Sequence, residues 1–475
     1  MSRFFAEFHA HNSLPRTEKQ KMRVDFEEAL LYYNKNSVPL EDALARLSIE
    51  NLGGFYVRPP ILWYSLDNAA KIYPLSMKHG QMSVFRLSVR FNDDVAPQLL
   101  QMALTFTIKR FPQFATTVKK GFFWHYLDTA KRRYSIQPES DIPCKPLKIS
   151  QSSSQTFRVL YYRNRVSVEF FHILTDGVGA MVFLKTLTAE YLRLMGAKKE
   201  TGDGILDING LPSQSETENE FLRVDKTEKT SGFIDKLAVQ MSGKLSKSKP
   251  CRVLHFNMDA SMLKEAAVRR NTSITVYILA LMFIAGKRAT DSLEGNMSIQ
   301  LPVNMRNFYP SDTLRNFSMY CGIKIPVSEI MDIDSIIPII TCIIEQKVTK
   351  HAMSEMANST ERMVSAARYI PLFIKAPIAS IGYGLLSDRI FSNTLSNLGV
   401  VTMPPGLAQY ISSMDAVLGG ALTNRASCAM ITFGNTATLS ITKCTADPSF
   451  EEKMFELFVS DGVTPTVEGS ELCED

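Results

Sequence analysis

The sequence predicts a mixed α/β protein that is built as two lobes of similar length. Segments with the two-residue alternation of strands and segments with the 3–4-residue spacing of helices follow one another along the chain. Residues 197–250 have a different, Ser/Glu-rich and Lys-rich character, which is typical of an interlobe linker or an exposed crossover. A chain of 475 residues can bury a large core without disulfides or a structural metal.

The composition is that of a globular cytoplasmic protein. With 45% hydrophobic and 21% charged residues, the chain is neither disordered nor fibrous. The net charge of +5 is small and the basic residues are scattered, so no nucleic-acid partner is indicated. Seven dispersed cysteines without C-x-x-C spacing are typical of reduced thiols in the cytoplasm, and the first residues lack the apolar segment of a signal peptide.

Two apolar segments are too short or too interrupted to cross a membrane. Residues 273–286 fall short of the roughly 20 apolar residues that a spanning helix needs. Residues 370–386 contain two prolines, two glycines and Lys375. We therefore expect two buried helices and no transmembrane segment. For the second segment, contact with a membrane surface is the alternative, but the lack of a clear amphipathic stripe favours burial.

Residues 1–58 predict an N-terminal helical extension. Apolar residues recur there with helical spacing, at Met22, Phe26, Ala29, Leu30 and Tyr33. A second helix start follows near residues 37–42. The expected structure is a helical hairpin that packs on the main body, with a partner-docking element as the alternative.

A strand and a helix are predicted next. Residues 82–91 alternate between apolar and polar side chains, as in a half-buried strand. Asp93 or Asp94 can cap the following helix, which has its apolar positions on one face and ends before Pro112. Residues 122–126 predict a short aromatic strand.

Residues 157–171 predict a β-hairpin that turns at Arg163 and Asn164. Because side chains alternate with a period of two, His172 shares the apolar face of Val168 and Phe170, at the end of the second strand. A helix is predicted after Gly177, with one apolar stripe over residues 180–194.

His172, Asp176 and Gly177 form the strongest candidate catalytic pattern. A neutral histidine is the usual general base at physiological pH. Asp176 lies at a strand-to-helix turn, where a carboxylate that points inward needs a cationic partner. Gly177 allows an unusual backbone conformation there. The alternative is a core histidine followed by an aspartate that caps the helix.

The segment FFHILTDGVGAMVFLKTL resembles the H-x-x-x-D-G segment of the chloramphenicol acetyltransferase-like superfamily, which includes condensation domains and alcohol acyltransferases. Further segments in the expected order are similar to bacterial alcohol acetyltransferases, at residues 66–74, 85–91, 109–114, 122–128, 301–320 and 394–404. The resemblance covers about residue 58 to the end. Two departures stand out: Phe171 replaces the first histidine of the double-histidine form, and the Asn-Asp pair of wax ester synthases is missing.

The resemblance implies an α+β sandwich of two acetyltransferase-like lobes in tandem with an active-site tunnel between them. The lobes would span residues 59–196 and 251–475. His172 would be the base that takes a proton from an acceptor, which then attacks an acyl thioester. Asp176 would be structural and bonded to an arginine, with Arg306 the first candidate and Arg315 the second. Gly177 would leave room for the donor.

The resemblance also implies a donor of hydrogen bonds to the oxyanion, which is a role for Ser396 or Asn397 on the second lobe. Closing a strand turn is the alternative for these two residues and for Asn304, a further candidate of the same kind. No metal or redox cofactor is implied, because acyl-CoA as co-substrate brings its own leaving group. Basic residues, among them Arg269, Arg270 and residues 244–249, could meet the coenzyme phosphates, or they could form a solvated face.

Three functions remain in competition. The first is an acyl-CoA-dependent O-acyltransferase with an alcohol or amine acceptor. The second is a free-standing condensation enzyme, which would need a carrier protein as partner because this chain contains no carrier sequence. The third is a non-catalytic binding protein on the same fold, which the missing first histidine and the N-terminal extension favour.

Overall fold

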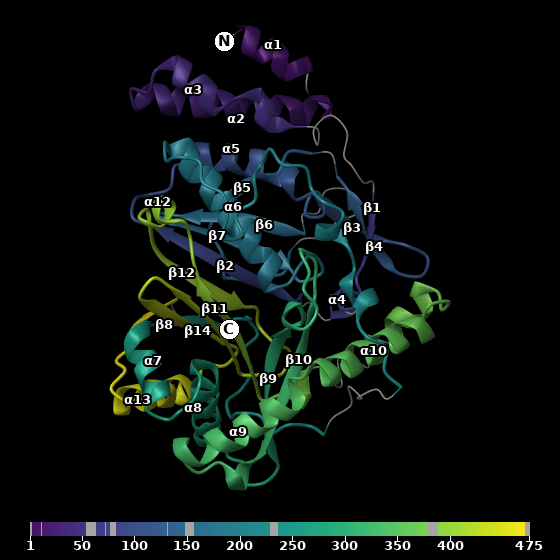
Figure 1. Ribbon diagram of the computed structural model, residues 1–475, viewed down its shortest axis with the longest axis vertical. Helices are drawn as coiled ribbons and strands as arrows, with labels where there is room; N and C mark the ends of the chain where they lie inside the picture. Colours follow the sequence, from purple (N-terminus) through teal and green to yellow (C-terminus); the bar gives the residue numbers. More distant parts are fainter. Residues whose placement is uncertain are drawn as a thin grey trace.

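A computed structural model shows two lobes, each a sheet covered by helices, with a smaller sheet at the side (Figure 1). It describes residues 2–10, 12–53, 63–71, 73–76, 82–130, 132–147, 156–228, 236–378 and 388–470. The strand orders are β12-β2-β7-β6-β5 in the first lobe, β10-β9-β11-β13-β14-β8-β15 in the second and β1-β4-β3 in the small sheet.

The first lobe contains the predicted hairpin and the helices beside it. Its strands are β2 (Val84–Phe91), β5 (Ile136–Pro138), β6 (Phe157–Tyr162), β7 (Arg165–Phe171) and β12 (Ile411–Leu418). Its helices are α5 (Pro97–Thr107), with the 3₁₀ turn η4 (Ile108–Arg110), and α6 (Gly177–Met195). The hairpin prediction is confirmed. The prediction of an aspartate cap on α5 is wrong, because Ala96 precedes Pro97, and proline at the first position has no N–H that needs a cap.

The N-terminal extension is helical and packs on the first lobe, as the prediction of helices packed on the main body required. It comprises α1 (Ser2–Ala10), α2 (Arg16–Lys35), α3 (Leu40–Arg46) and the 3₁₀ turn η1 (Ile49–Leu52). The Tyr33 hydroxyl donates to the carbonyl of Leu194 at 2.7 Å. Arg133 binds both carboxylate oxygens of Asp25, at 2.6 and 2.7 Å. Residues 54–58 lie outside the described part of the chain.

The small sheet consists of β1 (Trp63–Ser65), β3 (Thr116–Lys120) and β4 (His125–Thr129), with the short helix α4 (Tyr73–Ser76) nearby. The predicted aromatic strand therefore starts later than expected. Residues 122–124 instead form the turn between β3 and β4, where Gly121 N donates to the carbonyl of Trp124 at 3.0 Å.

The second lobe holds the apolar helix α8 (Ile274–Arg288), which is buried as predicted. Its strands are β8 (Arg252–Asp259), β9 (Asn296–Asn304), β10 (Ser318–Pro326), β11 (Asn393–Val401), β13 (Ala426–Phe433), β14 (Thr436–Lys443) and β15 (Thr466–Gly469). Its other helical elements are α7 (Ala260–Val268), η7 (Met305–Asn307), η8 (Val327–Glu329), α9 (Ile333–Lys347), α10 (Lys350–Ala366), η9 (Asp388–Ile390) and α13 (Ser449–Ser460). The short helix α12 (Pro405–Ala408) lies beside the first lobe (Figure 1), where Leu407 joins the core.

Two features of the chain connect the lobes. Strand β12 comes from the C-terminal part of the chain but pairs with β2, so it forms the edge of the first sheet. The segment 197–228 holds only the 3₁₀ turns η5 (Ser215–Thr217) and η6 (Glu220–Arg223) and lies across both lobes. Within it, Glu216 accepts from Arg110 at 2.5 and 2.6 Å, and its carbonyl accepts from Leu314 N at 2.9 Å.

The prediction that residues 370–386 form a buried helix is wrong for the part that the structure describes. Residues 372–378 are helical, but Phe373 is 71% exposed and Ile378 is 67% exposed. The rest of the segment lies outside the described residues. In the described chain, no helix has the length and apolar character that crossing a membrane requires.

Candidate functional site

His172 directly follows β7, and its ring lies against two aromatic side chains. Its backbone N–H donates to the carbonyl of Ser83 at 2.8 Å, which continues the pairing of β7 with β2. The imidazole stacks on Tyr73 with ring centroids 4.7 Å apart, and it contacts Phe85 at 5.0 Å. Phe171 is fully buried on the opposite face of the strand.

Asn316 selects the tautomer of the neutral His172 ring. Asn316 Nδ2 donates to the His172 carbonyl at 2.9 Å and to Asp67 Oδ2 at 3.2 Å. Both amide hydrogens thus have acceptors, and this orientation leaves Asn316 Oδ1 facing His172 Nδ1 at 2.9 Å. Because Oδ1 can only accept, Nδ1 carries the proton and Nε2 keeps its lone pair.

Asp67 fixes the orientation of the Asn316 amide by accepting one of its hydrogen bonds. Its side chain is fully buried, and Oδ1 accepts from Ala70 N at 2.7 Å. Arg315 Nη2 lies 3.7 Å from Asp67 Oδ2 and donates to the Ser65 carbonyl at 2.5 Å. Burial raises the pKa of Asp67, and the Arg315 charge together with the two hydrogen bonds opposes that rise. A buried carboxylate with a buried cation beside it satisfies the requirement for paired charges.

Burial lowers the pKa of His172 below its usual value, while Asp176 and the bond to Asn316 oppose the shift. The imidazole is therefore neutral at physiological pH. A neutral ring whose Nε2 carries a lone pair can accept a proton from a molecule bound beside it.

Asp176 points away from the imidazole and joins the two lobes. It caps α6, because Oδ1 accepts from Val178 N at 3.1 Å and from Gly179 N at 3.2 Å. Its Oδ2 accepts from Arg306 Nη1 at 2.8 Å and from Phe317 N at 2.8 Å, both in the second lobe. The carboxylate is buried, so its negative charge is balanced by Arg306 inside the protein.

Arg306 is the arginine that the structure places on Asp176, and Arg315 lies on Asp67 instead. Arg306 also donates to the carbonyls of Thr313 and Arg315, at 2.7 and 2.9 Å. Asn304 Oδ1 accepts from Arg306 N at 3.1 Å and Nη1 at 3.2 Å. Asn304 is thus a turn residue that braces Arg306, which is the alternative to its expected role as an oxyanion donor.

Two glycines let the second lobe approach the end of β7. A Cβ atom on Gly177 would lie 2.7 Å from Leu398 Cδ2, and one on Gly179 would lie 2.2 Å from the carbonyl oxygen of Leu314. The space at Gly177 is therefore filled by Leu398 of β11. Leu398 meets Gly177 only with the end of its flexible side chain, so the expectation that Gly177 leaves room for the donor stays a prediction.

Ser396 and Asn397 point to opposite sides of β11. Asn397 Nδ2 donates to Thr275 Oγ1 at 2.9 Å and its Oδ1 accepts from Gly399 N at 2.8 Å, so this side chain faces α8 and closes a strand turn. By alternation, Ser396 faces the other way, as does Leu398, which packs against the first lobe. Within the part of the chain that the structure describes, the Ser396 hydroxyl has no hydrogen-bond partner.

Three of the basic residues expected near the coenzyme bind other groups of the protein. Arg270 Nη2 lies 2.6 Å from Asp461 Oδ1, and Arg269 Nη2 donates to the Asp461 carbonyl at 2.7 Å. Lys249 Nζ donates to the carbonyl of Leu422 at 2.8 Å. Among the described residues, no group of three His, Cys, Asp or Glu side chains could hold a metal ion.

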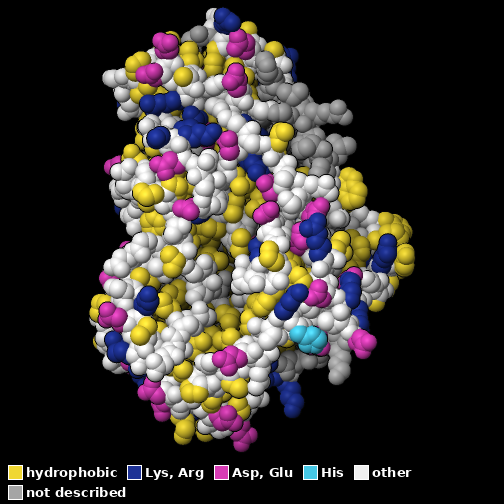
Figure 2. Space-filling view, in the orientation of Figure 1, with side chains coloured by type: hydrophobic (Ala, Val, Ile, Leu, Met, Phe, Trp, Pro, Cys, Tyr) yellow, Lys and Arg dark blue, Asp and Glu magenta, His cyan; other side chains and the backbone are white. Residues whose placement is uncertain are grey.

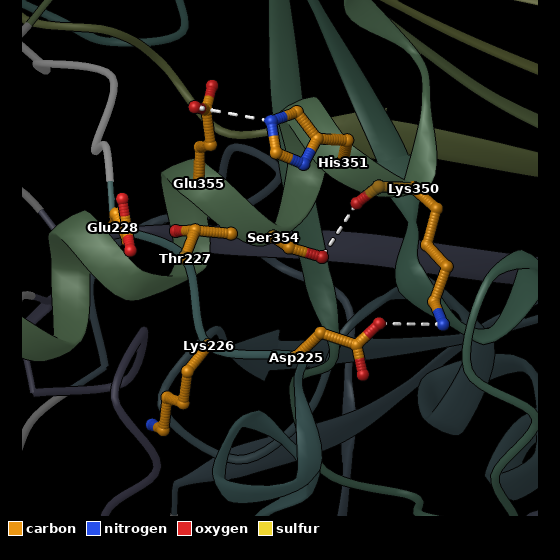
Figure 3. A pocket seen from close by; sticks show the side chains of 8 residues that line it. All are labelled: Asp225, Lys226, Thr227, Glu228, Lys350, His351, Ser354 and Glu355. Carbon is orange, nitrogen blue, oxygen red and sulfur yellow. Dashed lines mark hydrogen bonds and ion pairs between the residues drawn. The ribbon is translucent and has the colours of Figure 1, made fainter.

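An open pocket of about 590 Å³ lies beside α10 (Figure 3), and no predicted site residue lines it. Lys350 Nζ there binds Asp225 Oδ2 at 2.7 Å, and His351 Nε2 lies 3.5 Å from Glu355 Oε1. Four of its charged or titratable side chains thus pair with one another, and Lys226 pairs with Glu361 outside the pocket lining.

A second pocket of about 590 Å³ lies between the two lobes and is lined by Arg86, Arg165 and His255, among others. Arg86 forms ion pairs with Glu139 and Glu169 at 2.6 Å. Because Arg86 and Phe85 alternate along β2, this pocket lies on the face of the sheet opposite the His172 ring.

The sequence analysis missed Asp67 and Asn316. Both lie in segments that carry the resemblance, residues 66–74 and 301–320, and both are polar residues next to apolar ones. Burial of such residues requires polar partners, which was the available signal. The sequence does not show which residues those partners are, however. In the chain, Asn316 lies 144 residues from His172 and 249 residues from Asp67.

Neither the family models nor the curated protein sequences searched match this chain. Solved structures do match its fold. The trichothecene 15-O-acetyltransferase TRI3 of Fusarium sporotrichioides has a TM-score of 0.55 and 12% identity, over 84% of this chain and 94% of that one. F. sporotrichioides TRI101, complexed with coenzyme A and T-2, has a TM-score of 0.56 and 12% identity, over 85% and 99%.

The starter condensation domain of rhizomide synthetase RzmA, in complex with C8-CoA and Leu-SNAC, is similar as well, with a TM-score of 0.53 and 12% identity over 82% of this chain and 92% of that one. The predicted fold is confirmed: the chain has the two-lobed chloramphenicol acetyltransferase-like fold that these proteins share.

Proposed function

We propose that the protein is an acyltransferase that moves an acyl group from an acyl-CoA thioester to an alcohol or amine acceptor, with His172 as the general base. The observation that carries this proposal is the buried chain Asp67–Asn316–His172, which leaves the lone pair on Nε2.

In the proposed reaction, His172 Nε2 takes the proton of the acceptor hydroxyl as its oxygen attacks the thioester carbonyl carbon. A tetrahedral intermediate with a negative oxygen forms, and the Ser396 hydroxyl donates a hydrogen bond to that oxygen. The carbon–sulfur bond then breaks, and the imidazolium returns the proton to the leaving thiolate. A donor aimed at a developing oxyanion contributes about 3–4 kcal/mol in enzymes where one has been removed.

In this mechanism Asp176 and Arg306 are positioning residues. They fix the start of α6 against the second lobe and so hold the backbone that follows His172. The proposed division of the chain is an N-terminal lobe at residues 59–196 that supplies the base, and a C-terminal lobe at residues 251–475 that supplies the hydroxyl.

The choice of acyl-CoA as donor is supported by the neighbours of the same fold that were solved with coenzyme A or C8-CoA, and the choice of an oxygen acceptor by the neighbour named a 15-O-acetyltransferase. The condensation domains among these neighbours favour a second candidate, in which a carrier protein delivers the acyl thioester. Free acyl-CoA and carrier-bound acyl groups, supplied in parallel, separate the two.

The test measures acceptor-dependent thiol release from acetyl- to palmitoyl-CoA with pooled alcohols and amines. We expect His172→Ala to lose about 10²–10⁴-fold in rate. The matched control is His351→Ala, because His351 is an exposed histidine on α10. Equal activity of His172→Ala and the wild type would refute the proposed base. If neither free nor carrier-bound donors are used, the result favours the non-catalytic binding protein on this fold.

A further inference from the structure

Seven large apolar side chains lie exposed together on one edge of the molecule. They come from the β3–β4 turn and from the chain after α10, and we call them the apolar shoulder: Phe122, Phe123, Tyr369, Ile370, Phe373, Ile374 and Ile378. Figure 2 shows hydrophobic side chains gathered on the right-hand edge of the protein, where the β3–β4 turn meets the end of α10 in Figure 1. Tyr369 is 76% exposed and Phe122 is 66% exposed.

The two segments of the shoulder are held against each other. Leu372 N donates to the carbonyl of Phe122 at 2.8 Å. The Lys375 ammonium lies 3.1 Å from the centre of the Trp124 ring and donates to the Ala367 carbonyl at 3.0 Å. The side chains of Leu372 and Lys375 thus point inward and anchor the segment, while its large apolar side chains are directed at solvent.

Positive charge surrounds the shoulder. Lys120 at the end of β3 and Arg368 before Tyr369 are both exposed. Burial, together with the charges of Lys120 and Lys375, lowers the pKa of His125 to about 4. Burial together with the charge of Lys71 lowers the pKa of Lys375 to about 8. The nearby acid Glu361 on α10 is ion-paired with Lys226.

We propose that the apolar shoulder docks on the surface of a bilayer that contains anionic phospholipids. Contiguous exposed apolar side chains of this size mark an interaction site rather than ordinary surface. Aromatic and aliphatic side chains with basic residues beside them are the composition of an interfacial anchor, which gains from apolar insertion and from attraction to anionic headgroups. A second copy of the chain fits less well, because both shoulders would present Lys120 and Arg368 to each other.

The shoulder is also connected to the candidate site through the small sheet. Strand β1 belongs to the same small sheet as the β3–β4 turn, and the loop that follows β1 carries Asp67. In that loop, Lys71 lies 5.6 Å from the centre of the Trp124 ring. Docking would therefore bring the side of the molecule with this loop to the lipid surface. The inference does not depend on the proposed acyl transfer.

Flotation of the full chain with vesicles tests the proposal. The vesicles contain phosphatidylcholine alone, or phosphatidylcholine and phosphatidylglycerol in equal parts. We expect binding to the anionic vesicles and about 10- to 100-fold weaker binding by Phe122→Ser/Phe373→Ser. The matched control is Leu211→Ser/Leu293→Ser, because these leucines lie outside the shoulder and are 91% and 82% exposed. This variant should bind as the wild type does. Circular dichroism and urea unfolding verify that all variants are folded.

Charge reversal separates the electrostatic part. We expect Lys120→Glu/Arg368→Glu to lose binding to anionic vesicles, whereas Lys35→Glu/Lys264→Glu, with the same change of net charge elsewhere, retains it. Failure of the wild type to bind either kind of vesicle overturns the proposal, as does equal binding by the wild type and the Phe122/Phe373 variant. A dimer in light scattering that this variant converts to a monomer also overturns it, and assigns the shoulder to contact between two copies.

Discussion

Replacing Asn316 by alanine removes the group that orients the proposed base. The change deletes the acceptor for the His172 Nδ1 proton, at 2.9 Å, and the two bonds that Asn316 Nδ2 donates to the His172 carbonyl and to Asp67. An ordinary hydrogen bond contributes about 1 kcal/mol to stability, and a buried carboxylate oxygen that loses its donor costs about 1–3 kcal/mol. We therefore expect Asn316→Ala to destabilise the fold by about 3 kcal/mol.

The same substitution should lower kcat more than a loss of stability explains. Without Asn316 Oδ1, the Nδ1 proton loses the side-chain acceptor that lies at 2.9 Å, and the ring can turn or change tautomer. A loss of about 1.4–2.8 kcal/mol in transition-state stabilisation corresponds to a 10- to 100-fold lower kcat. Thiol release at saturating acyl-CoA measures it, and urea unfolding of the same sample gives the folded fraction.

Asn358→Ala is the matched control. Asn358 is also a buried asparagine, and its Nδ2 donates two hydrogen bonds, at 2.7 and 2.8 Å, but none of them reaches His172. Both variants should lose stability, and only Asn316→Ala should lose kcat. If the kcat values of the two folded variants are equal, Asn316 is structural and the argument about the tautomer is refuted.

Three further predictions concern the same region. Gly179→Ala should unfold the interlobe contact, because the added Cβ would lie 2.2 Å from the backbone oxygen of Leu314; an unchanged urea midpoint would contradict this. Arg306→Met should cost about 3–5 kcal/mol of unfolding free energy by leaving Asp176 buried without a cation, and Arg306→Met/Asp176→Asn should recover part of it, which denaturant titration of both variants measures. kcat/KM should fall with decreasing pH only below the ordinary histidine range. The reason is that burial lowers the pKa of His172, and the neutral base is lost as the pH falls through that lowered value. A midpoint of the kcat/KM profile above the ordinary histidine pKa would contradict this.

The local pattern of the chain predicted much of the first lobe. Two-residue alternation located the hairpin of β6 and β7 and placed His172 on its apolar face, and the apolar run at residues 273–286 predicted buried α8. Asp176 at the start of a helical stripe indicated a cap, which the structure contains. These features depend on neighbours within a few residues, so periodicity and capping rules report them directly.

The small sheet and its surroundings were predicted less well. The three aromatic residues of the β3–β4 turn resemble a strand in composition, but they form a turn, and Phe122 and Phe123 are exposed. Residues 370–378 resemble a core helix for the same reason. Hydrophobicity predicts burial only when another element is available to cover the segment, and the sequence pattern does not show which element lies nearby.

By itself, then, the sequence determined the hairpin that ends at His172, the cap at the start of α6, the buried helix α8 and, through its motifs, the two-lobed fold. Only the tertiary structure decided that Asn316 and Asp67 select the tautomer of His172, that Asn397 faces α8 while Ser396 faces the first lobe, and that β12 crosses to the first sheet. The physical reason is range: secondary structure follows from contacts between near neighbours in the chain, whereas a buried polar network depends on packing that brings together residues more than a hundred positions apart.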